Sequence, residues 1–273
     1  MTFDISQIEF SKNDLNSNIS LPNNITTNLA EFIGIIVGDG NLGFYQGKLE
    51  SGKCYVSYQI RISGNINEMI YLDHVNSIFQ SIFNTKLHYH RDHGINAILL
   101  RKQSKAIQQF LIKQCGLKLN RKTESASIPV IIKEAERPIK TSFLRGLADT
   151  DFSLTFKKKS FKGHTYPVIK ASFKSRPLVR DLEYLFKDLG FTYCVCYDEK
   201  TFDKRWGEYH RHSIYLNGKK NLQKWEAEVG FSNPKFLKRL RKWKEEGHCP
   251  PGYALSPRGD LNPGSVAVLN QVD

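Results

Sequence analysis

Two stretches of the sequence, FIGIIVGDGNLGF (Phe32–Phe44) and LRGLADTDFSLTF (Leu144–Phe156), follow the same pattern. Shifting the first by 112 residues matches two glycines, two aspartates and four apolar residues: Gly34 with Gly146, Asp39 with Asp151, Leu42 with Leu154 and Phe44 with Phe156. A repeat at a fixed offset indicates two structural units of one kind in a single chain.

The residues after each copy predict the same order of elements. After the first copy, residues 53–63 alternate as in a strand, residues 67–83 have apolar residues at helical spacing, and two short strands precede a closing helix at 105–117. The second half repeats this order, so each half is predicted to be helix, two strands, helix, two strands, helix. Apolar residues at helical spacing are expected in the core, namely Phe79, Phe83, Leu182, Leu185 and Phe186.

The repeat also divides the chain. The linker is polar and contains two prolines, and the last segment is rich in proline and glycine and lacks helical periodicity, so we expect it to be disordered. The predicted parts are an N-terminal extension (1–27), a first subdomain (28–120), a linker (121–140), a second subdomain (141–248) and a tail (249–273).

Basic side chains outnumber acidic ones by 40 to 27, which gives a formal net charge of +13. The excess is uneven, since residues 1–125 carry a net charge of +3 and residues 152–248 carry +11. A protein that neutralises phosphates releases their counterions, so this excess favours a nucleic acid as partner. An acidic membrane surface is disfavoured because no long basic amphipathic helix is predicted.

Several features bear on the compartment. No apolar run approaches the roughly 20 residues that span a bilayer. The N-terminus lacks the basic and then apolar order of a signal peptide, and the five cysteines are sparse. We therefore expect an intracellular protein of the cytoplasm, nucleoid or organelle matrix, not a secreted one, and no membrane partner.

Each repeat places small residues four positions apart on its predicted helix: Gly34 and Gly38 in the first, Gly146 and Thr150 in the second. Small residues at this spacing let two helix backbones approach closely. We therefore expect these four residues to form a helix–helix interface about a pseudo-twofold axis.

An aspartate follows each of these helical patterns, Asp39 in the first half and Asp151 in the second. With the axis between the helices, both carboxylates would meet beside two helix C-termini, which carry negative partial charge. A divalent cation relieves this repulsion, and carboxylate oxygens suit Mg²⁺. In a basic protein, the pair indicates metal-assisted hydrolysis of phosphodiesters.

FIGIIVGDG and LRGLADTDF resemble the two copies of the LAGLIDADG motif in single-chain LAGLIDADG homing endonucleases. The resemblance spans residues 28–247 and implies an α+β fold in which two pseudo-symmetric αββαββα subdomains form a saddle of antiparallel sheets over double-stranded DNA. It also implies a monomer, without an obligatory protein partner, that makes a staggered double-strand cut at a long asymmetric site.

The resemblance further implies that Asp39 and Asp151 bind Mg²⁺, for which Mn²⁺ can substitute, at the scissile phosphates. The preceding residues, Gly38 and Thr150, are assigned to the same metal site. The two copies differ at the earlier acidic position of the motif, which is Val37 in the first and Asp149 in the second.

Members of this family usually place a lysine or glutamine near the active-site water network. Aligning SKAIQQFL with KKNLQKWE puts Lys105 and Lys220 at equivalent positions, where the last strand meets the closing helix, and implies that they act on this network. A solvated helix start is the alternative for both. Lys174 resembles another such position, and its counterpart falls near Ser63 or Gly64.

DNA contacts are expected from two sets of residues. The run KKKSFK (157–162) lies between the first two strands of the second half, so we expect Lys157, Lys158 and Lys159 to contact phosphates. Base contacts are expected from residues of the alternating strands, and Lys174 is assigned to the same surface. These strand residues are Tyr58, Gln59, Arg61, Lys170 and Ser172.

Two other functions fit the same motifs: an RNA-splicing maturase that binds intron RNA, and a catalytically silent DNA-binding protein. Both aspartates are present, which favours the nuclease. The sequence GDGNLG (38–43) matches a dinucleotide-binding fingerprint, but a turn and a strand follow it instead of a helix. A zinc site is not expected, because the histidines and cysteines lack CxxC spacing (His88, His90, His93, Cys194, Cys196, His210 and His212).

Overall fold

The computed structural model describes residues 2–91, 96–120, 124–159, 163–204 and 207–254. The first half of the chain contains α2 (Thr27–Val37), β1 (Gly40–Lys48), β2 (Cys54–Asn65), α3 (Met69–Phe83), β3 (His88–Arg91), β4 (Ala97–Gln103) and α4 (Lys105–Lys113). The second half contains α6 (Arg137–Asp151), β5 (Phe152–Lys158), β6 (His164–Phe173), α7 (Arg176–Asp188), β7 (Cys194–Asp203), β8 (Gly207–Asn217) and α8 (Lys219–Glu228), and α9 (Pro234–Glu246) follows it.

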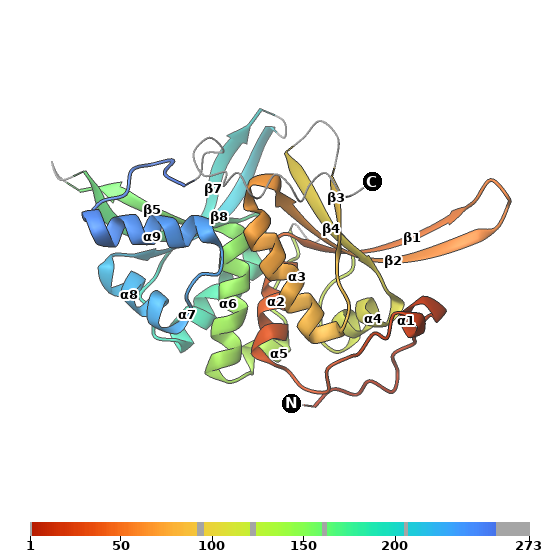
Figure 1. Ribbon diagram of the computed structural model, residues 1–273. Coiled ribbons are helices and arrows are strands. Elements are labelled where there is room, and N and C mark those ends of the chain that lie inside the picture. The colour runs from red at the N-terminus through yellow and green to blue at the C-terminus, as the bar shows by residue number, and fades with distance from the viewer. Residues whose placement is uncertain (1, 92–95, 121–123, 160–162, 205–206, 255–273) are drawn as a thin grey trace.

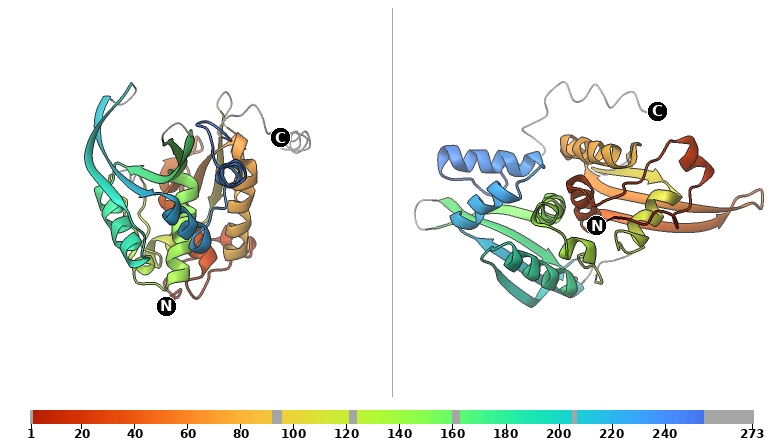
Figure 2. Two further views of the ribbon diagram at one scale, coloured as in Figure 1. Left: turned by 90° about the vertical axis from the view of Figure 1, so that its left-hand side faces the viewer. Right: turned by 90° about the horizontal axis from the view of Figure 1, so that it is seen from below.

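Each half forms one four-stranded antiparallel sheet, with strand order β1-β2-β4-β3 in the first and β5-β6-β8-β7 in the second. Figure 1 shows α2 and α6 side by side in the middle of the molecule, with one sheet on each side. In Figure 2 the same arrangement is seen from the side and from below. The predicted α+β fold of two αββαββα halves is confirmed.

The two faces of each sheet differ because side chains alternate along a strand. One face carries the apolar residues, such as Ile60 and Ile62 of β2, and is covered by helices. All five residues that helical spacing assigned to the core are at most 1% exposed. The opposite face, which we call the outer face, carries polar and aromatic side chains.

The motif helices pack backbone to backbone at two glycines. A Cβ on Gly34 would lie 2.2 Å from the carbonyl oxygen of Phe143, and a Cβ on Gly146 would lie 2.0 Å from that of Glu31. No side chain fits at either position unless the helices separate. The structure thus places Gly34 and Gly146 at the predicted helix–helix interface.

The N-terminal extension (1–27) packs on the first half. Its short helix α1 (Lys12–Asn16) presents the buried Asp14, whose carboxylate accepts hydrogen bonds from the backbone N–H of Ser11 and of Ala106, in the first turn of α4. Phe3 meets Phe110 of α4 edge to face, with ring centroids 5.0 Å apart. The extension therefore belongs to the core of the first half.

Two predicted boundaries need correction. The linker (121–140) contains the short helix α5 (Val130–Lys133), and α6 already begins at Arg137, because Pro138 occupies the first turn of that helix, where proline is tolerated. The tail (249–273) begins within the fold, since Cys249 is buried and its N–H bonds to the carbonyl of His164. Residues 255–273 lie outside the described part of the chain.

Among the described residues, no helix has both the length and the apolar character needed to cross a bilayer.

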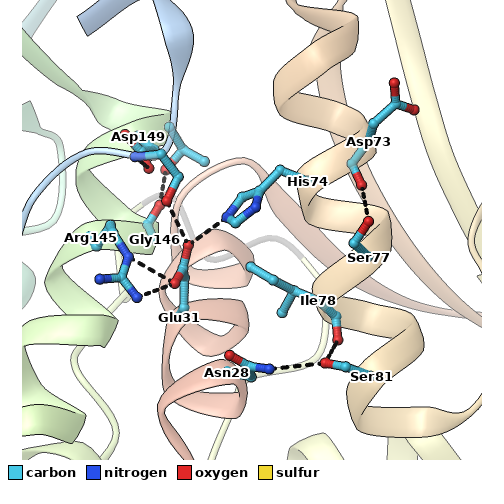
Figure 3. Close-up of polar contacts among 12 residues, drawn as sticks. Asn28, Glu31, Asp73, His74, Ser77, Ile78, Ser81, Arg145, Gly146 and Asp149 are labelled. Carbon is cyan, nitrogen blue, oxygen red and sulfur yellow. Dashed lines mark hydrogen bonds and ion pairs between the residues drawn. The ribbon is translucent and has the colours of Figure 1, made fainter. Parts of the chain in front are cut away.

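A buried polar cluster joins the two halves beside the glycine contacts. Figure 3 shows Glu31 of α2 between Arg145 of α6 and His74 of α3. The Arg145 Nε donates to Glu31 Oε2 at 2.8 Å, and His74 Nε2 lies 2.9 Å from Glu31 Oε1. Burial alone would raise the pKa of Glu31, but the hydrogen bonds and charges of His74 and Arg145 hold this pKa below its ordinary value. Glu31 is therefore an ionised link between the halves.

Replacing Glu31 by Gln should lower the free energy of unfolding at pH 7 by about 3 kcal/mol, the low end for a broken buried pair, because Arg145 stays partly exposed. The pKa of Glu31 is lower in the folded than in the unfolded state, so its contribution is present above about pH 4.5 and is lost as the pH falls through the folded pKa. Urea unfolding at pH 7 and pH 3.5 measures this. The E31Q variant should lose more stability relative to wild type at pH 7 than at pH 3.5, whereas E134Q, at an exposed site, should match wild type at both. An equal loss at both pH values would contradict the ionised link.

Candidate active site

The two motif aspartates lie at the same end of the helix pair. Helix α2 ends at Val37, Gly38 caps it, and Asp39 precedes β1. Helix α6 runs through Asp151, directly before β5. Both aspartates are solvent-exposed, and the backbone carbonyl of Asp39 accepts a hydrogen bond from the N–H of Ser63 on β2 at 3.1 Å.

Gly38 brings the two chain segments together at this end. A Cβ on Gly38 would lie 2.1 Å from Thr150 Oγ1 and 2.7 Å from Asp151 Oδ2. The Asp151 carboxylate therefore lies against the residue that precedes Asp39, as the pseudo-twofold axis requires. Thr150 Oγ1 donates to the carbonyl of Leu147 at 2.9 Å, which fixes its position in this contact.

A cleft of about 330 Å³ opens at the same point. Asp151 lines it together with Gly38 and Gly40, which flank Asp39 in the sequence. Ser172 and Lys174, at the end of β6, line it as well. The structure thus brings Lys174 to the cleft of Asp151, where the sequence had placed it only by resemblance.

The donor set fits Mg²⁺. Carboxylate oxygens are the ligands that this ion prefers, and it commonly takes one or two of them and completes its shell with water and substrate phosphates. Among the described residues, no cluster of three or more His, Cys, Asp or Glu side chains could hold a metal ion. Asp39 and Asp151 are thus suited to a metal shared with a bound phosphate, and unsuited to a closed structural site.

Lys105 and Lys220 lie away from the aspartates, contrary to their expected place in one water network. The N–H of Ser104, directly before Lys105, bonds to the carbonyl of Tyr58, and Tyr58 pairs with Phe44 of β1. Phe44 is four strand residues beyond Gly40, so Lys105 lies roughly 13 Å from the start of β1, where Asp39 is. Its ammonium group is ion-paired with Glu9 of the N-terminal extension. Lys220 lies in the first turn of α8 and is exposed.

The ladder registers also correct two pairings between the halves. Residue 101 of β4 and residue 215 of β8 occupy equivalent positions in the two sheets, because residue 101 pairs with Arg61 and residue 215 with the equivalent Lys170. Counting four residues on from each shows that the counterpart of Lys105 is Lys219, the first residue of α8, and not Lys220. Likewise Ile62 and Ala171 are equivalent, which makes Asn65 the counterpart of Lys174, in place of Ser63 or Gly64.

Arg61 and Lys170 occupy equivalent positions next to the aspartates. Arg61 pairs with Asn41, two residues after Asp39, and Lys170 pairs with Ser153, two residues after Asp151. Both side chains are on the outer face and are partly exposed. The sequence had assigned both to base contacts. The signal that identifies them as symmetric neighbours of the aspartates is the strand register, which the sequence alone does not supply.

A chain of side-chain contacts orients Arg61. Gln59 accepts a hydrogen bond from Arg61 Nε at 2.6 Å and donates to Ser57 Oγ at 2.8 Å, and the Arg61 guanidinium carbon lies 4.8 Å from the centre of the Tyr45 ring. Gln59 is only 5% exposed, so it positions Arg61 and is not itself available to a base.

Tyr58 points to the opposite face of β2. Adjacent strand residues alternate between faces, and the Tyr58 ring packs against Phe44 on the helix-covered side, with centroids 5.3 Å apart. Tyr58 therefore does not share a surface with Gln59 and Arg61, although the sequence grouped the three together.

Ser172 shares the outer face of β6 with Lys170. Its hydroxyl lies 2.8 Å from the hydroxyl of Ser213 on β8, and the Lys170 ammonium lies 5.0 Å from the centre of the Tyr215 ring. These contacts leave Lys170 and Ser172 on one polar surface with the cleft at its end.

Asp149, at the earlier acidic position of the second motif, is structural. It is 1% exposed, and burial raises its pKa to about 7, although hydrogen bonds from the backbone N–H of Ser232 and from Asn233 act in the opposite direction. The residue faces the helix-covered interior, so it does not join Asp151 at the cleft.

The basic run in α9 is largely engaged. Lys235 is ion-paired with Glu68, Lys242 with Glu246 and Lys244 with Glu226. Arg239 is buried, and its Nε donates to the carbonyl of Leu154 on β5. Helix α9 therefore covers the second sheet from the helix side.

The backbone resembles solved homing endonucleases. It matches I-DmoI in complex with DNA and Ca with a TM-score of 0.52 and 17% identity, over 79% of this chain and 97% of that chain. It matches a point mutant of I-SmaMI with a TM-score of 0.53 and 13% identity, over 90% of this chain and 97% of that chain.

No protein-family model matches the sequence, and no curated protein matches it significantly. The likeness therefore rests on the two four-stranded sheets and the helix pair between them, over most of the chain. This single chain has the fold of the LAGLIDADG homing endonucleases.

Proposed function

We propose that this protein is a metal-dependent endonuclease that cuts double-stranded DNA site-specifically and leaves staggered ends. One observation carries the proposal: the glycine-mediated helix crossing delivers Asp39 and Asp151 to one end of the molecule, beside a cleft and between two polar outer faces. A stability requirement does not explain two exposed carboxylates at that position. The net charge of +13 supports a polyanionic substrate.

Asp39 and Asp151 would hold Mg²⁺ at the scissile phosphates, where the ion supplies charge neutralisation and lowers the pKa of a bound water. Thr150 sets the separation of the two segments by filling the space beside Gly38. Arg61 and Lys170 are placed to hold the phosphates and to stabilise the negative charge that develops during hydrolysis. Lys174 in the cleft supplies a further cation on the side of Asp151.

The outer faces provide the recognition surface in this proposal. In the first sheet the row at Arg61 continues with Arg101 of β4 and His88 of β3. In the second sheet the equivalent row is Lys170, Tyr215 and Cys194. Because the two rows differ in charge and shape, the two halves would read different sequences, which fits an asymmetric target.

The single variants R61Q and K170Q should each lower the single-turnover cleavage rate by about a hundredfold, which is the effect of removing one donor that stabilises the developing charge. The K105Q variant, far from the aspartates, should stay within a few-fold of wild type. Rates measured with saturating protein separate this effect from binding, and R61K should recover part of the loss because it retains the charge. A larger loss in K105Q than in R61Q would contradict the assignment.

Cleavage of a randomised duplex library in Mg²⁺, Ca²⁺ or EDTA, followed by sequencing of the ends, tests the proposed function. We expect staggered ends at one long motif in Mg²⁺ alone. Specific duplexes that are retained but never cut would overturn the nuclease in favour of a silent DNA-binding protein. If no duplex is selected from the library, and a pool of structured RNA tested in parallel contains RNAs that bind, the nuclease is overturned in favour of a maturase.

A further inference from the structure

We infer that Tyr209 of β8 is a positioning residue that orients Lys174 in the cleft beside Asp151, and that it does so for the cut in only one of the two DNA strands. The role assigned to Tyr209 rests on the proposed function, since it takes cleavage of duplex DNA as the reaction. It adds to the site a residue from a hairpin that belongs to neither motif.

The place of Tyr209 follows from the unequal lengths of β6 and β8. Strand β6 ends at Phe173, which pairs with His212, whereas β8 begins five residues earlier, at Gly207. Residues 207–211 therefore extend past the end of β6 and pair with β7. Figure 1 shows the β7–β8 hairpin extending beyond α6 at the top of the molecule. Lys174 directly follows the end of β6, so it lies beside this extension.

The two side chains meet on the outer face of the sheet. Lys174 is two residues after Ser172, and side chains two apart along a strand share a face. Tyr209 is four residues before Ser213, whose hydroxyl lies 2.8 Å from that of Ser172. The Lys174 ammonium lies 4.3 Å from the centre of the Tyr209 ring, well within the range of a cation–π contact.

A ring contact suits a cation that must act on a substrate. A carboxylate at this distance would neutralise the ammonium group, whereas the face of an aromatic ring attracts the group and leaves its full charge available to a phosphate. The same arrangement occurs at the other cations near the aspartates. The Arg61 guanidinium carbon lies 4.8 Å from the centre of the Tyr45 ring, and the Lys170 ammonium lies 5.0 Å from that of Tyr215.

The first half has no equivalent of this pair. The counterpart of Lys174 is Asn65, whose side chain carries no charge and caps the short 3-10 helix η1 (Ile66–Glu68) by accepting a hydrogen bond from the N–H of Asn67 at 2.9 Å. Only the second half therefore places a lysine at this position of the cleft. We expect Tyr209 to affect the strand that is cut on the side of Lys174, and to leave the other cut unchanged.

Three variants of the full-length protein test this role: Y209L removes the ring, Y209F retains it, and K174Q removes the cation. The two strands of the duplex selected from the library are labelled differently, and single-turnover rates in Mg²⁺ are measured for each strand with saturating protein. K174Q should slow one strand by about a hundredfold. Y209L should slow the same strand by about tenfold, within the range of one cation–π contact, so that nicked duplex accumulates. Y209F should stay within about threefold of wild type on both strands.

A double variant separates positioning from a merely structural role. If Tyr209 acts through Lys174, Y209L/K174Q should be no slower on that strand than K174Q alone, because the two effects are then not additive. Independent effects in the double variant, or equal slowing of both strands by Y209L, would overturn the role of Tyr209. The control is Y184L, at an exposed tyrosine of α7, which should cut both strands at the wild-type rate.

Failure of this role differs from failure of the proposed function. If the wild type cuts both strands and Y209L matches it on each, Tyr209 does not position Lys174 while the nuclease stands. If the wild type cuts neither strand, the proposed function is overturned, and the role of Tyr209 falls with it.

Discussion

Asn in place of Asp39 or Asp151 should lower the Mg²⁺-dependent cleavage rate at least about a thousandfold, equivalent to roughly 4 kcal/mol in the barrier. Asn keeps the volume of the side chain beside Gly38 and Thr150, so the helix end should keep its shape, but it removes the charge that holds the metal. Because that charge also repels DNA phosphates when no metal is bound, duplex affinity in EDTA should be unchanged or higher. Single-turnover cleavage and equilibrium binding on the same duplex provide the two measurements.

A control for this prediction is Glu134→Gln, which removes one exposed carboxylate from the segment before α6, at the opposite end of that helix from Asp151. This variant should cleave at the wild-type rate. Full cleavage by D39N and D151N would show that the paired aspartates do not hold the metal. Loss of cleavage together with loss of DNA affinity would show that the substitutions disturb the binding surface and not only the metal site.

Adding a single methyl group at Gly146 should destabilise the protein by at least about 3 kcal/mol, the upper range for overpacking. The Cβ would lie 2.0 Å from the carbonyl oxygen of Glu31 and 3.1 Å from the backbone nitrogen of Ile35. Both are backbone atoms in a helix, so no side chain can rotate away and α2 and α6 must separate. Urea denaturation of Gly146→Ala measures the loss, and cleavage activity should fall with it because the aspartates move apart.

Gly47→Ala makes the same chemical change on β1. The methyl group there would meet the outer part of the Tyr55 ring at 2.8 Å, and this exposed side chain can turn aside. The variant should keep a near-wild-type free energy of unfolding. If both variants unfold at the same urea concentration, the close approach at Gly146 does not contribute as proposed.

The sequence was sufficient to predict the fold because the repeated motif and the helical and strand spacings of the apolar residues are local patterns. The residue equivalences inferred between the two halves were wrong where the connections between strands differ in length. Ladder rows place β1 and β5 at an offset of 112 residues, β2 and β6 at 109, and β4 and β8 at 114. Only the strand register reveals these shifts, so Lys105 was matched with Lys220 instead of Lys219.

The site was predictable in part for a similar reason. The aspartates end the repeated helices, and their meeting follows from pseudosymmetry alone. The roles of Tyr58 and Gln59 depend on which strand face is covered, and that of Glu31 depends on partners 43 and 114 positions away. Contacts of this range leave no signal in a single sequence.

The buried link between Glu31 and Arg145 has a consequence for how such a protein could be taken apart. At the positions related by the repeat, Glu31 corresponds to Phe143 and Arg145 to Ile33, so the link exists in one direction only. Two copies of the first half would leave two buried acids without their arginine partners, and two copies of the second half would leave two arginines without the acid. If the gene were split between the halves, the fragments would assemble as unlike pairs, a heterodimer in place of either homodimer.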